Sequence, residues 1–242
     1  MKIISHFLSP IFAFVFILLL IIFHPIQWIG LKIFGSKGHQ KVVDVMNFFL
    51  VKSLLVLGVP VRLINPYKLP QNSTILFVAN HQSLFDIPPI IWFFRKHLPK
   101  FVSKKELGKG IPSVSFNLRH GGAALIDRKD GKKAIVELAK FAKRIGKNKW
   151  SAVIFPEGTR SRTGKPKKFA PNGLKTLVKY NPEAYVVPIS INNSWRVFKY
   201  GKYPFGIGKP ITITAHEAIK INSLPFNELF ETIESKIKSS VE

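Results

Sequence analysis

The chain has 242 residues, which suits one catalytic domain with an appendage, and it contains no cysteine, which excludes disulfides, thiolate nucleophiles and cysteine-bound zinc. It carries 37 Lys and Arg against 13 Asp and Glu, a formal net charge of +24 that indicates a polyanionic partner: nucleic acid, an anionic bilayer or a phosphorylated substrate. The 7 histidines show no HExxH spacing, so we expect no protein-bound metal.

The first predicted element is an apolar helix near the N-terminus. Residues 3–31 carry no formal charge, and Phe7 to Phe23 is almost continuous Phe, Leu, Ile and Val, which is long enough to enter a bilayer. It lacks a small-residue cleavage site after a short apolar core, and this favours a retained anchor over a removed signal peptide. We expect Pro10 and Pro25 to bracket the segment.

A second apolar segment, residues 42–57, carries Asp44, Asn47 and Lys52, which predicts a helix in the membrane interface rather than a second span. The sequence leaves open a single span and a two-helix monotopic anchor. Because the basic bulk of the chain follows the anchor, we expect a cell-membrane protein whose catalytic domain lies on the cytoplasmic side. We predict membrane-anchoring helices over residues 1–60 and an α/β domain over residues 61–242.

Beyond Gly58, short apolar runs alternate with amphipathic helices. This alternation predicts an α/β fold with a mixed, largely parallel sheet flanked by helices. The predicted strands cover residues 75–79, 100–103, 123–126, 152–155, 185–191 and 211–214. The predicted helices lie near residues 88–97, 112–118, 132–145 and 173–180, and a closing helix covers residues 226–237.

Polar clusters follow four of the predicted strands. They begin with His81 and Asp86 and continue with Lys104, Lys105 and Glu106, then Asp127 and Arg128, then residues 156–161. Each cluster alone also fits a solvated charge, a turn ion pair or an ordinary turn. In largely parallel sheets, however, ligands gather at the carboxyl ends of strands, so the repeated placement predicts a functional site at this edge.

The first cluster pairs a histidine with a carboxylate. His81 follows the end of a strand, and Asp86 lies in the first turn of the next helix, where Pro88 also fits. On one continuous helix the two side chains would diverge by about 140°, whereas a bend between them lets them meet. Contact would keep one imidazole nitrogen protonated and leave the other free as a base. The pair alone also fits a helix N-cap beside a surface histidine.

Four motifs together resemble the glycerolipid acyltransferase family, typified by the 1-acylglycerol-3-phosphate acyltransferases. In the order and spacing of that family they stand here as Asn80 to Asp86, Gly122 to Arg128, Phe155 to Ser161, and Val187-Pro188-Ile189. They span roughly residues 75–190, about half of the chain, and the N-terminus matches the family only in its apolar character. Leu125 stands where a Phe is frequent, and that position is apolar either way.

The resemblance implies transfer of a fatty acyl group from a thioester, acyl-CoA or acyl carrier protein, to the sn-2 hydroxyl of lysophosphatidic acid, giving phosphatidic acid in phospholipid synthesis. It implies that His81 is the base, that Asp86 fixes its tautomer, and that no acyl-enzyme and no further cofactor is needed. Arg160 is the best candidate for the acceptor phosphate, because a forked guanidinium suits phosphate. The whole substrate-binding set is Lys104, Arg128, Glu157, Gly158, Thr159 and Arg160.

The sequence also leaves other acceptors and other classes of function open. Glycerol 3-phosphate or an amino-lipid could replace lysophosphatidic acid as the acceptor. A basic membrane-surface protein or a nucleic-acid-binding protein would also use a charge of +24, but no recognition-helix or RNA-platform pattern is present. We therefore expect anionic membrane lipid and no nucleic acid as partners. An α/β serine hydrolase is excluded by the absence of Gly-x-Ser-x-Gly.

Overall fold

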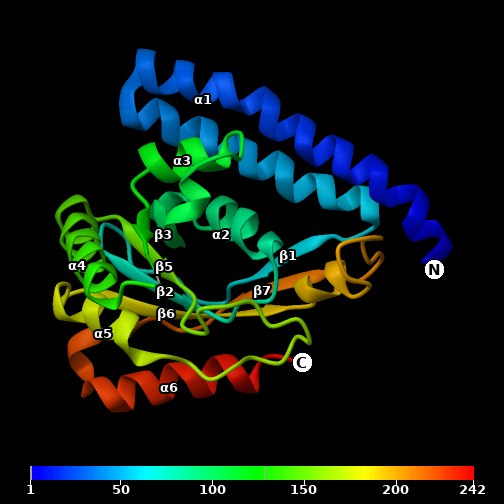
Figure 1. The fold of residues 1–242 in the computed structure, drawn as a ribbon. Coiled ribbons are helices and arrows are strands. Elements are labelled where there is room, and N and C mark those ends of the chain that lie inside the picture. Colours follow the sequence, from blue (N-terminus) through cyan, green and yellow to red (C-terminus); the bar gives the residue numbers. More distant parts are fainter. Residues whose placement is uncertain (1, 128) are drawn as a thin grey trace.

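The computed structural model describes residues 2–127 and 129–242, which form three layers (Figure 1). The described strands are β1 (Val61–Ile64), β2 (Ile75–Ala79), β3 (Pro99–Lys104), β4 (Ala124–Ile126), β5 (Ser151–Ile154), β6 (Tyr185–Asn192), β7 (Ile211–Ala215) and β8 (Ile219–Lys220). Their order in the sheet is β1-β7-β6-β2-β5-β3-β4, with β8 paired to β6.

The strands that carry the predicted site all run the same way. β6, β2, β5, β3 and β4 pair in parallel, whereas β7 and β8 are antiparallel to β6, and β1 is parallel to β7. The carboxyl ends of β2 to β6 therefore meet at one edge of the sheet. The expectation of an α/β fold with a mixed, largely parallel sheet flanked by helices is confirmed.

Helices cover both faces of this sheet. They are α1 (Lys2–Ser53), α2 (Ile87–Phe93), α3 (Val114–His120), α4 (Gly131–Asn148), α5 (Pro171–Lys179) and α6 (Phe226–Ser239). α1 and α2 pack on one face, and α4, α5 and α6 pack on the other (Figure 1). The helix predicted near residues 88–97 ends at Phe93, and a 3₁₀ turn over Arg95–His97 replaces its last part.

The central strand β2 is buried on both faces, as its unbroken apolar sequence requires. Ile75, Phe77 and Ala79 point toward α1 and α2, while Leu76 and Val78 point toward α4, α5 and α6. Because successive side chains of a strand alternate between faces, one five-residue run joins the two halves of the core. β2 is thereby fixed in position just before His81.

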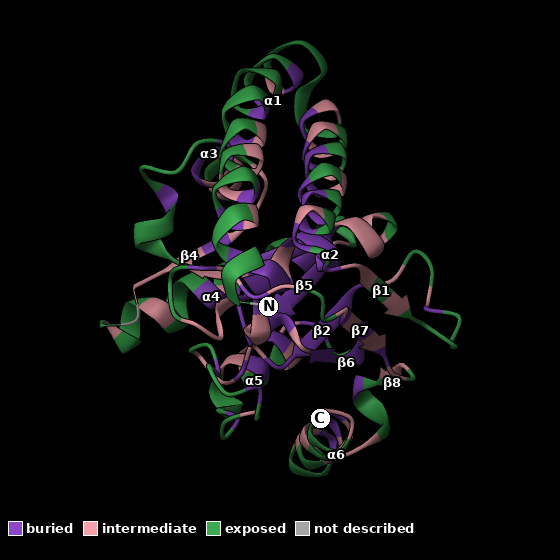
Figure 2. Ribbon diagram, turned by 90° about the vertical axis from the view of Figure 1, so that its right-hand side faces the viewer, coloured by how far each residue is buried: buried purple, intermediate pink, exposed green. Residues whose placement is uncertain are grey.

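α1 is a hairpin of two antiparallel arms, which Figures 1 and 2 show side by side. The chain reverses at Gly35, whose φ of 65° and ψ of −158° lie in a region that is essentially restricted to glycine. The arms meet through an apolar cluster of Leu20, Phe23, Met46 and Leu50. Residues 2–53 therefore form two packed helical arms.

The first arm continues through Pro10 and Pro25, so the expectation that these prolines bracket a helix is wrong. A proline removes one backbone donor but need not end a helix whose surroundings hold it in place. Here the Ser113 hydroxyl donates to the carbonyl of Leu20 at 2.6 Å, and the Ser113 N–H donates to His24 Nδ1 at 3.0 Å. The segment leading into α3 thus braces the arm just before Pro25.

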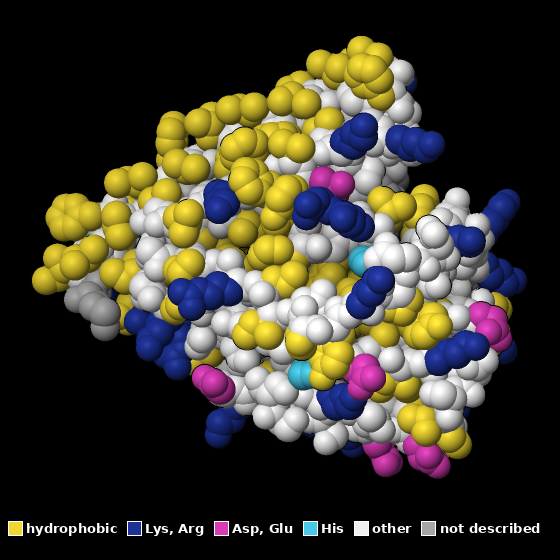
Figure 3. All heavy atoms as spheres, turned by 180° about the vertical axis from the view of Figure 1, so that it is seen from behind, with side chains coloured by type: hydrophobic (Ala, Val, Ile, Leu, Met, Phe, Trp, Pro, Cys, Tyr) yellow, Lys and Arg dark blue, Asp and Glu magenta, His cyan; other side chains and the backbone are white. Residues whose placement is uncertain are grey.

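Both arms contact the main core, through Phe12 in the first and Val43 in the second, but they differ in how much apolar surface they expose. In the second arm, Val43 belongs to the main core and the Phe48 ring lies 4.8 Å from that of Trp92 in α2, so this segment does more than lie in an interface. The outer side of the first arm instead exposes a row of large apolar side chains, among them Ile3, Phe7 and Phe14 (Figure 3). α1 is long and apolar enough to cross a membrane, and 22% of its most apolar stretch is buried.

Candidate active site

The site begins where β2 ends. The Asn80 side chain donates from Nδ2 to the carbonyl of Ile191 at 2.9 Å and accepts from the Ile191 N–H at Oδ1 at 2.7 Å. Since Ala79 pairs with Ile189 in the parallel ladder, this buried amide takes the place of further backbone pairing between β2 and β6. Asn80 therefore fixes the start of the turn that carries His81.

The structure brings the two predicted catalytic side chains together. His81 Nδ1 lies 2.8 Å from Asp86 Oδ2, because the 3₁₀ turn Leu84–Asp86 supplies the bend that one continuous helix lacks. The Asp86 side chain is fully buried and that of His81 is 16% exposed. The imidazole stacks on Phe155, with 4.1 Å between ring centroids. Nδ1 is thus occupied, and Nε2 is the nitrogen left to face a substrate.

Asp86 is held by more than its histidine. Its Oδ2 accepts from the backbone N–H groups of Gln82 at 2.7 Å and Ser83 at 2.9 Å. Its Oδ1 accepts from the hydroxyl of Ser194, which is buried in the turn that follows β6. Asp86 directly precedes α2 but makes no side-chain capping bond to it. The carboxylate therefore serves the histidine turn rather than the helix.

Sequence reasoning missed Gln82 and Ser194. Gln82 Nε2 donates to the carbonyl of Gly164 at 3.0 Å, and its Oε1 accepts from the Ser194 N–H at 3.0 Å. Gln82 lies inside the Asn80 to Asp86 motif, at a position that the motif leaves unspecified. Ser194 follows the Val-Pro-Ile segment of β6, and its sequence neighbourhood alone carries no signal of a contact 108 residues away.

Glu157 connects the loop after β5 to His81. Its Oε1 accepts from the His81 N–H at 2.7 Å, and its Oε2 accepts from the Lys167 N–H at 2.8 Å. Burial raises the pKa of Glu157, although these two hydrogen bonds act in the opposite direction. In return the Ser161 N–H donates to the His81 carbonyl at 2.7 Å. Both backbone groups of His81 are therefore bonded to this loop.

The same loop carries the other predicted substrate-binding residues. Gly158 has a φ of 68°, and its N–H donates to the Phe155 carbonyl at 3.0 Å, so this donor is used within the turn. Lys167 Nζ donates to Thr159 Oγ1 at 2.9 Å and to the carbonyl of Arg160 at 3.0 Å. The Arg160 side chain is exposed. Its backbone is held, while its guanidinium remains available to an anion in solution.

The remaining predicted residues lie farther along the edge. β3 and β4 are two and three strands away from β2, which corresponds to about 10 and 14 Å. Lys104 is exposed at the end of β3, and the structure does not bring it against His81. At the end of β4, Asp127 pairs with Lys105 across the loop. Arg128 lies outside the described residues.

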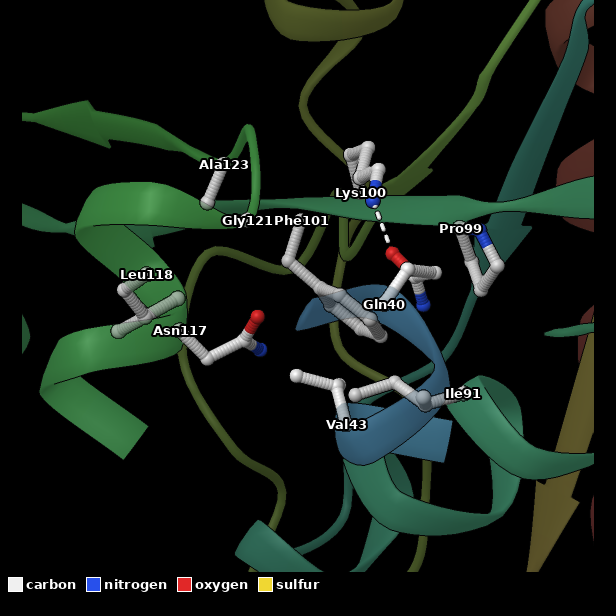
Figure 4. Close-up of a pocket in the computed structure, with 10 residues that line it drawn as sticks. All are labelled: Gln40, Val43, Ile91, Pro99, Lys100, Phe101, Asn117, Leu118, Gly121 and Ala123. Carbon is white, nitrogen blue, oxygen red and sulfur yellow. Dashed lines mark hydrogen bonds between the residues drawn. The ribbon is translucent and has the colours of Figure 1, made fainter. Parts of the chain in front are cut away.

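Two hollows of the described surface lie away from the catalytic pair. A cavity of about 20 Å³ lies between the second arm of α1, β3 and α3 (Figure 4). It is lined in part by Lys100, whose pKa burial lowers to about 8 and whose ammonium bonds to Gln40. A larger hollow of about 320 Å³ lies at the opposite edge of the sheet, beside Lys68 and His97. No group of three metal-ligating residues occurs in the described part of the chain.

The arrangement of a buried carboxylate that orients a histidine at the carboxyl end of a parallel strand suits general-base chemistry. The Acyltransferase family model matches residues 60–192, more than half of the chain, and the chain belongs to this family. The family resemblance drawn from the motifs is thus confirmed.

The chain is also similar to individual proteins. The chain is 38% identical to a 1-acyl-sn-glycerol-3-phosphate acyltransferase of Helicobacter pylori over 51% of this chain and 50% of that protein. It is 25% identical to the enzyme of the same name from Borreliella burgdorferi, over 71% and 66%. The chain thus spans about half to two thirds of the length of these relatives. The crystal structure of the 1-acyl-sn-glycerophosphate acyltransferase PlsC from Thermotoga maritima superposes with a TM-score of 0.81 at 25% identity, covering 99% of this chain and 95% of that one.

Proposed function

We propose that this chain transfers a fatty acyl group from a thioester to the sn-2 hydroxyl of 1-acyl-glycerol 3-phosphate, giving phosphatidic acid. The observation that carries the proposal is the 2.8 Å contact between His81 Nδ1 and the buried Asp86 at the carboxyl end of β2. The names of the relatives from Helicobacter pylori and Borreliella burgdorferi, and of the Thermotoga maritima structure, support this choice of acceptor.

The proposed chemistry follows from the nitrogen that Asp86 leaves free. The acceptor hydroxyl attacks the thioester carbonyl carbon while His81 Nε2 takes its proton, because an alcohol is a poor nucleophile at neutral pH. A C–O bond forms, the carbonyl becomes a tetrahedral oxyanion, and collapse breaks the C–S bond. The imidazolium, stabilised by Asp86, then returns its proton to the departing thiolate. The substrate hydroxyl plays the part that a serine plays in a triad.

Arg160 is the residue we assign to the acceptor phosphate. Its exposed guanidinium extends from a loop whose neighbouring residue, Ser161, is bonded to the His81 carbonyl. A planar fork binds two phosphate oxygens at once, which also orients the glycerol backbone. We keep Thr159, Gly158 and Glu157 as supports of this loop, and Lys104 as a longer-range cation.

The proposed reaction requires no cofactor beyond the acyl donor, since a thioester is already activated and His81 supplies the base. The donor is acyl-CoA or acyl carrier protein. Glycerol 3-phosphate and a lyso-amino-lipid are the alternative acceptors, because Arg160 would bind any phosphate of similar geometry.

The test is a transfer assay with purified protein and its His81→Ala variant. Lysophosphatidic acid and glycerol 3-phosphate are each offered with acyl-CoA or with loaded acyl carrier protein, and the products are identified by mass spectrometry. We expect phosphatidic acid from the first acceptor and almost none from the variant. Product from glycerol 3-phosphate alone would replace the proposed acceptor, and no product from any pair would refute the acyltransferase assignment.

We also propose a cell-membrane location with the catalytic domain on the cytoplasmic side. The exposed apolar outer surface of α1 supports attachment, and the many cations that follow it support this orientation. Carbonate washing should leave the protein in the membrane pellet, since burial of apolar surface is insensitive to salt. Quantitative release would contradict an apolar anchor. Protease added outside spheroplasts should leave the α/β domain intact.

A further inference from the structure

The solvent-facing side of α4 concentrates positive charge. Its exposed cations, with Glu137 as the acidic residue among them, are Lys132, Lys133, Lys140, Lys143, Arg144 and Lys147. At about 100° per residue, all of them fall on the side opposite the buried stripe of the helix. α6, in the same layer, is acidic by comparison, with Glu228, Glu231 and Glu234 against Lys236 and Lys238. Of these two helices, α4 is therefore the basic one. We call these six cations the basic α4 surface.

Two aliphatic side chains stand exposed beside these cations. Ile135 is 57% exposed and Val136 is 53% exposed, and Val136 points directly outward between Lys132 and Lys140. Protein–protein interfaces commonly combine apolar contact at the centre with a charged and polar rim. The surface thus offers both contact area and electrostatic attraction.

A bilayer that contacts α1 does not account for this charge. α1 and α2 lie on one face of the sheet, whereas α4 packs on the other face (Figure 1). Attraction to an anionic membrane is screened within about 8–10 Å at physiological salt, and a sheet and a helix layer lie between. Lys133 pairs with Asp130 and Lys140 pairs with Glu137, but the six cations outnumber these two carboxylates, and the excess positive charge is self-repulsive. The partner that relieves this repulsion must approach from the aqueous phase.

The position of α4 connects it to the reaction. α4 begins at Gly131, soon after the end of β4, on the same edge of the sheet as His81. The ends of β4 and β2 are separated by about 14 Å, which a thioester on a long flexible arm can cover. The helix is about 27 Å long, which is longer than the contact that the single nucleotide of coenzyme A would make. We propose that the basic α4 surface docks a small acidic protein that carries the acyl group as a thioester. This inference rests on the proposed function and specifies its donor.

Charge reversal on α4 tests the proposal. Lys132→Glu with Lys147→Glu places negative charge at both ends of the surface, at exposed positions that leave the core untouched. The matched control is Lys68→Glu with Lys96→Glu, which changes the net charge equally at exposed positions on the opposite edge of the sheet. All three full-length proteins are assayed in detergent with lysophosphatidic acid, using palmitoyl-loaded acyl carrier protein or palmitoyl-CoA as the donor.

We expect the α4 variant to raise the KM for the loaded carrier protein by about tenfold, because opposite-charge contacts become repulsive, and to leave the KM for palmitoyl-CoA within twofold of wild type. The control variant should match wild type with both donors. An unchanged KM for the carrier protein, an equal loss with both donors, or a wild type that accepts only palmitoyl-CoA would overturn the docking proposal while leaving the proposed function intact. A wild type inactive with both donors would refute the proposed function and the docking proposal with it.

The alternative of membrane contact by α4 is checked on vesicles. Binding of the α4 variant to phosphatidylcholine vesicles with and without phosphatidylglycerol should match that of wild type. A selective loss on the anionic vesicles would assign the surface to lipid and overturn the proposal.

Discussion

The carboxyl edge of the sheet has two halves that hold their side chains differently. At the ends of β2, β5 and β6, Asp86 and Glu157 are each bonded to at least two groups from other positions, and Asp86 is fully buried. At the ends of β3 and β4, Lys104 and Lys105 are exposed, and the Lys105–Asp127 pair faces solvent.

The difference shows what each half can do. A buried carboxylate with several fixed donors has one geometry, so it can orient one imidazole nitrogen. Exposed charges attract anions at a distance but impose little orientation, because water and salt weaken each contact. Substitutions in the central half should therefore alter turnover, and those in the outer half should alter little.

The largest effect is expected for His81→Ala. Loss of a general base costs about 10²- to 10⁴-fold in turnover. The variant should remain folded, because the backbone bonds of residue 81 to Glu157 and Ser161 remain, with a lower thermal midpoint caused by the lost ring contacts with Asp86 and Phe155. Turnover is measured with lysophosphatidic acid and palmitoyl-CoA. His97→Ala, on the opposite edge, is the control and should be almost fully active; wild-type turnover in His81→Ala would contradict the mechanism.

Ser194→Ala tests whether the hydrogen bonds that hold Asp86 matter for turnover. It leaves Asp86 Oδ1 without the hydroxyl that bonds it, so the carboxylate can shift away from its histidine. We expect kcat to fall about tenfold while the KM for lysophosphatidic acid stays constant. The matched control is Ser190→Ala, a buried serine of β6 whose hydroxyl contacts His216 instead. If both variants reduce kcat equally, the effect is structural and Ser194 does not position Asp86.

Arg160→Lys tests whether an exposed residue of the central half also requires a defined geometry. A lysine keeps the charge but loses the two-pronged fork. The KM for lysophosphatidic acid should rise severalfold, with a smaller change in kcat. Lys104→Arg, a change of similar size on β3, should leave both constants unchanged. Equal KM values for Arg160→Lys and wild type would remove Arg160 from the phosphate site.

The raised pKa of Glu157 should make the stability of the folded chain depend on pH. Burial raises its pKa above the ordinary value of 4.5, so between that value and the raised one the folded chain binds more protons than the unfolded chain. The contribution of this group to stability therefore falls as pH rises through that window. The thermal midpoint of wild type minus that of Glu157→Gln should decrease over the same interval. Glu183→Gln, at an exposed site, is the control, and a constant difference for Glu157 would contradict its raised pKa.

The smallest effect is expected for Lys105→Met. It removes an exposed ion pair with Asp127, and such pairs contribute little because solvent already screens them. The thermal midpoint and the KM for lysophosphatidic acid should both stay within error of wild type, in low and in high salt. A tenfold change in turnover would show that the outer half of the edge also holds a defined geometry.

Much of the fold could be predicted because its core strands are apolar on both faces. β2 is the clearest case, since five consecutive apolar residues permit little except a buried strand. β1 and β8 were missed for the opposite reason. β1 alternates between half-buried and exposed positions over four residues, and β8 has only two residues, so neither gives a distinct pattern.

The individual contacts within the site were predictable only between residues that are close in sequence. The five-residue spacing of His81 and Asp86 limited their geometry to a bend, and the structure contains that bend. The contacts of Gln82 with Gly164 and of Ser194 with Asp86 join residues 82 and 108 positions apart. These contacts depend on the order of strands in the sheet, which a local pattern does not contain. The placement of Lys104 away from His81 has the same origin.

The reversal of α1 at Gly35 brings an aromatic side chain of its first arm against the residue that precedes Asp86. A straight helix over Lys2–Ser53 would be about 78 Å long and would carry its first residues far from the domain. Folded back, the first arm places Phe12 with 5.6 Å between its ring centroid and that of Phe85, directly before Asp86. A side chain at Gly35 would be strained in this backbone conformation. The backbone conformation of Gly35 thus contributes to the contact between Phe12 and Phe85, the residue directly before Asp86.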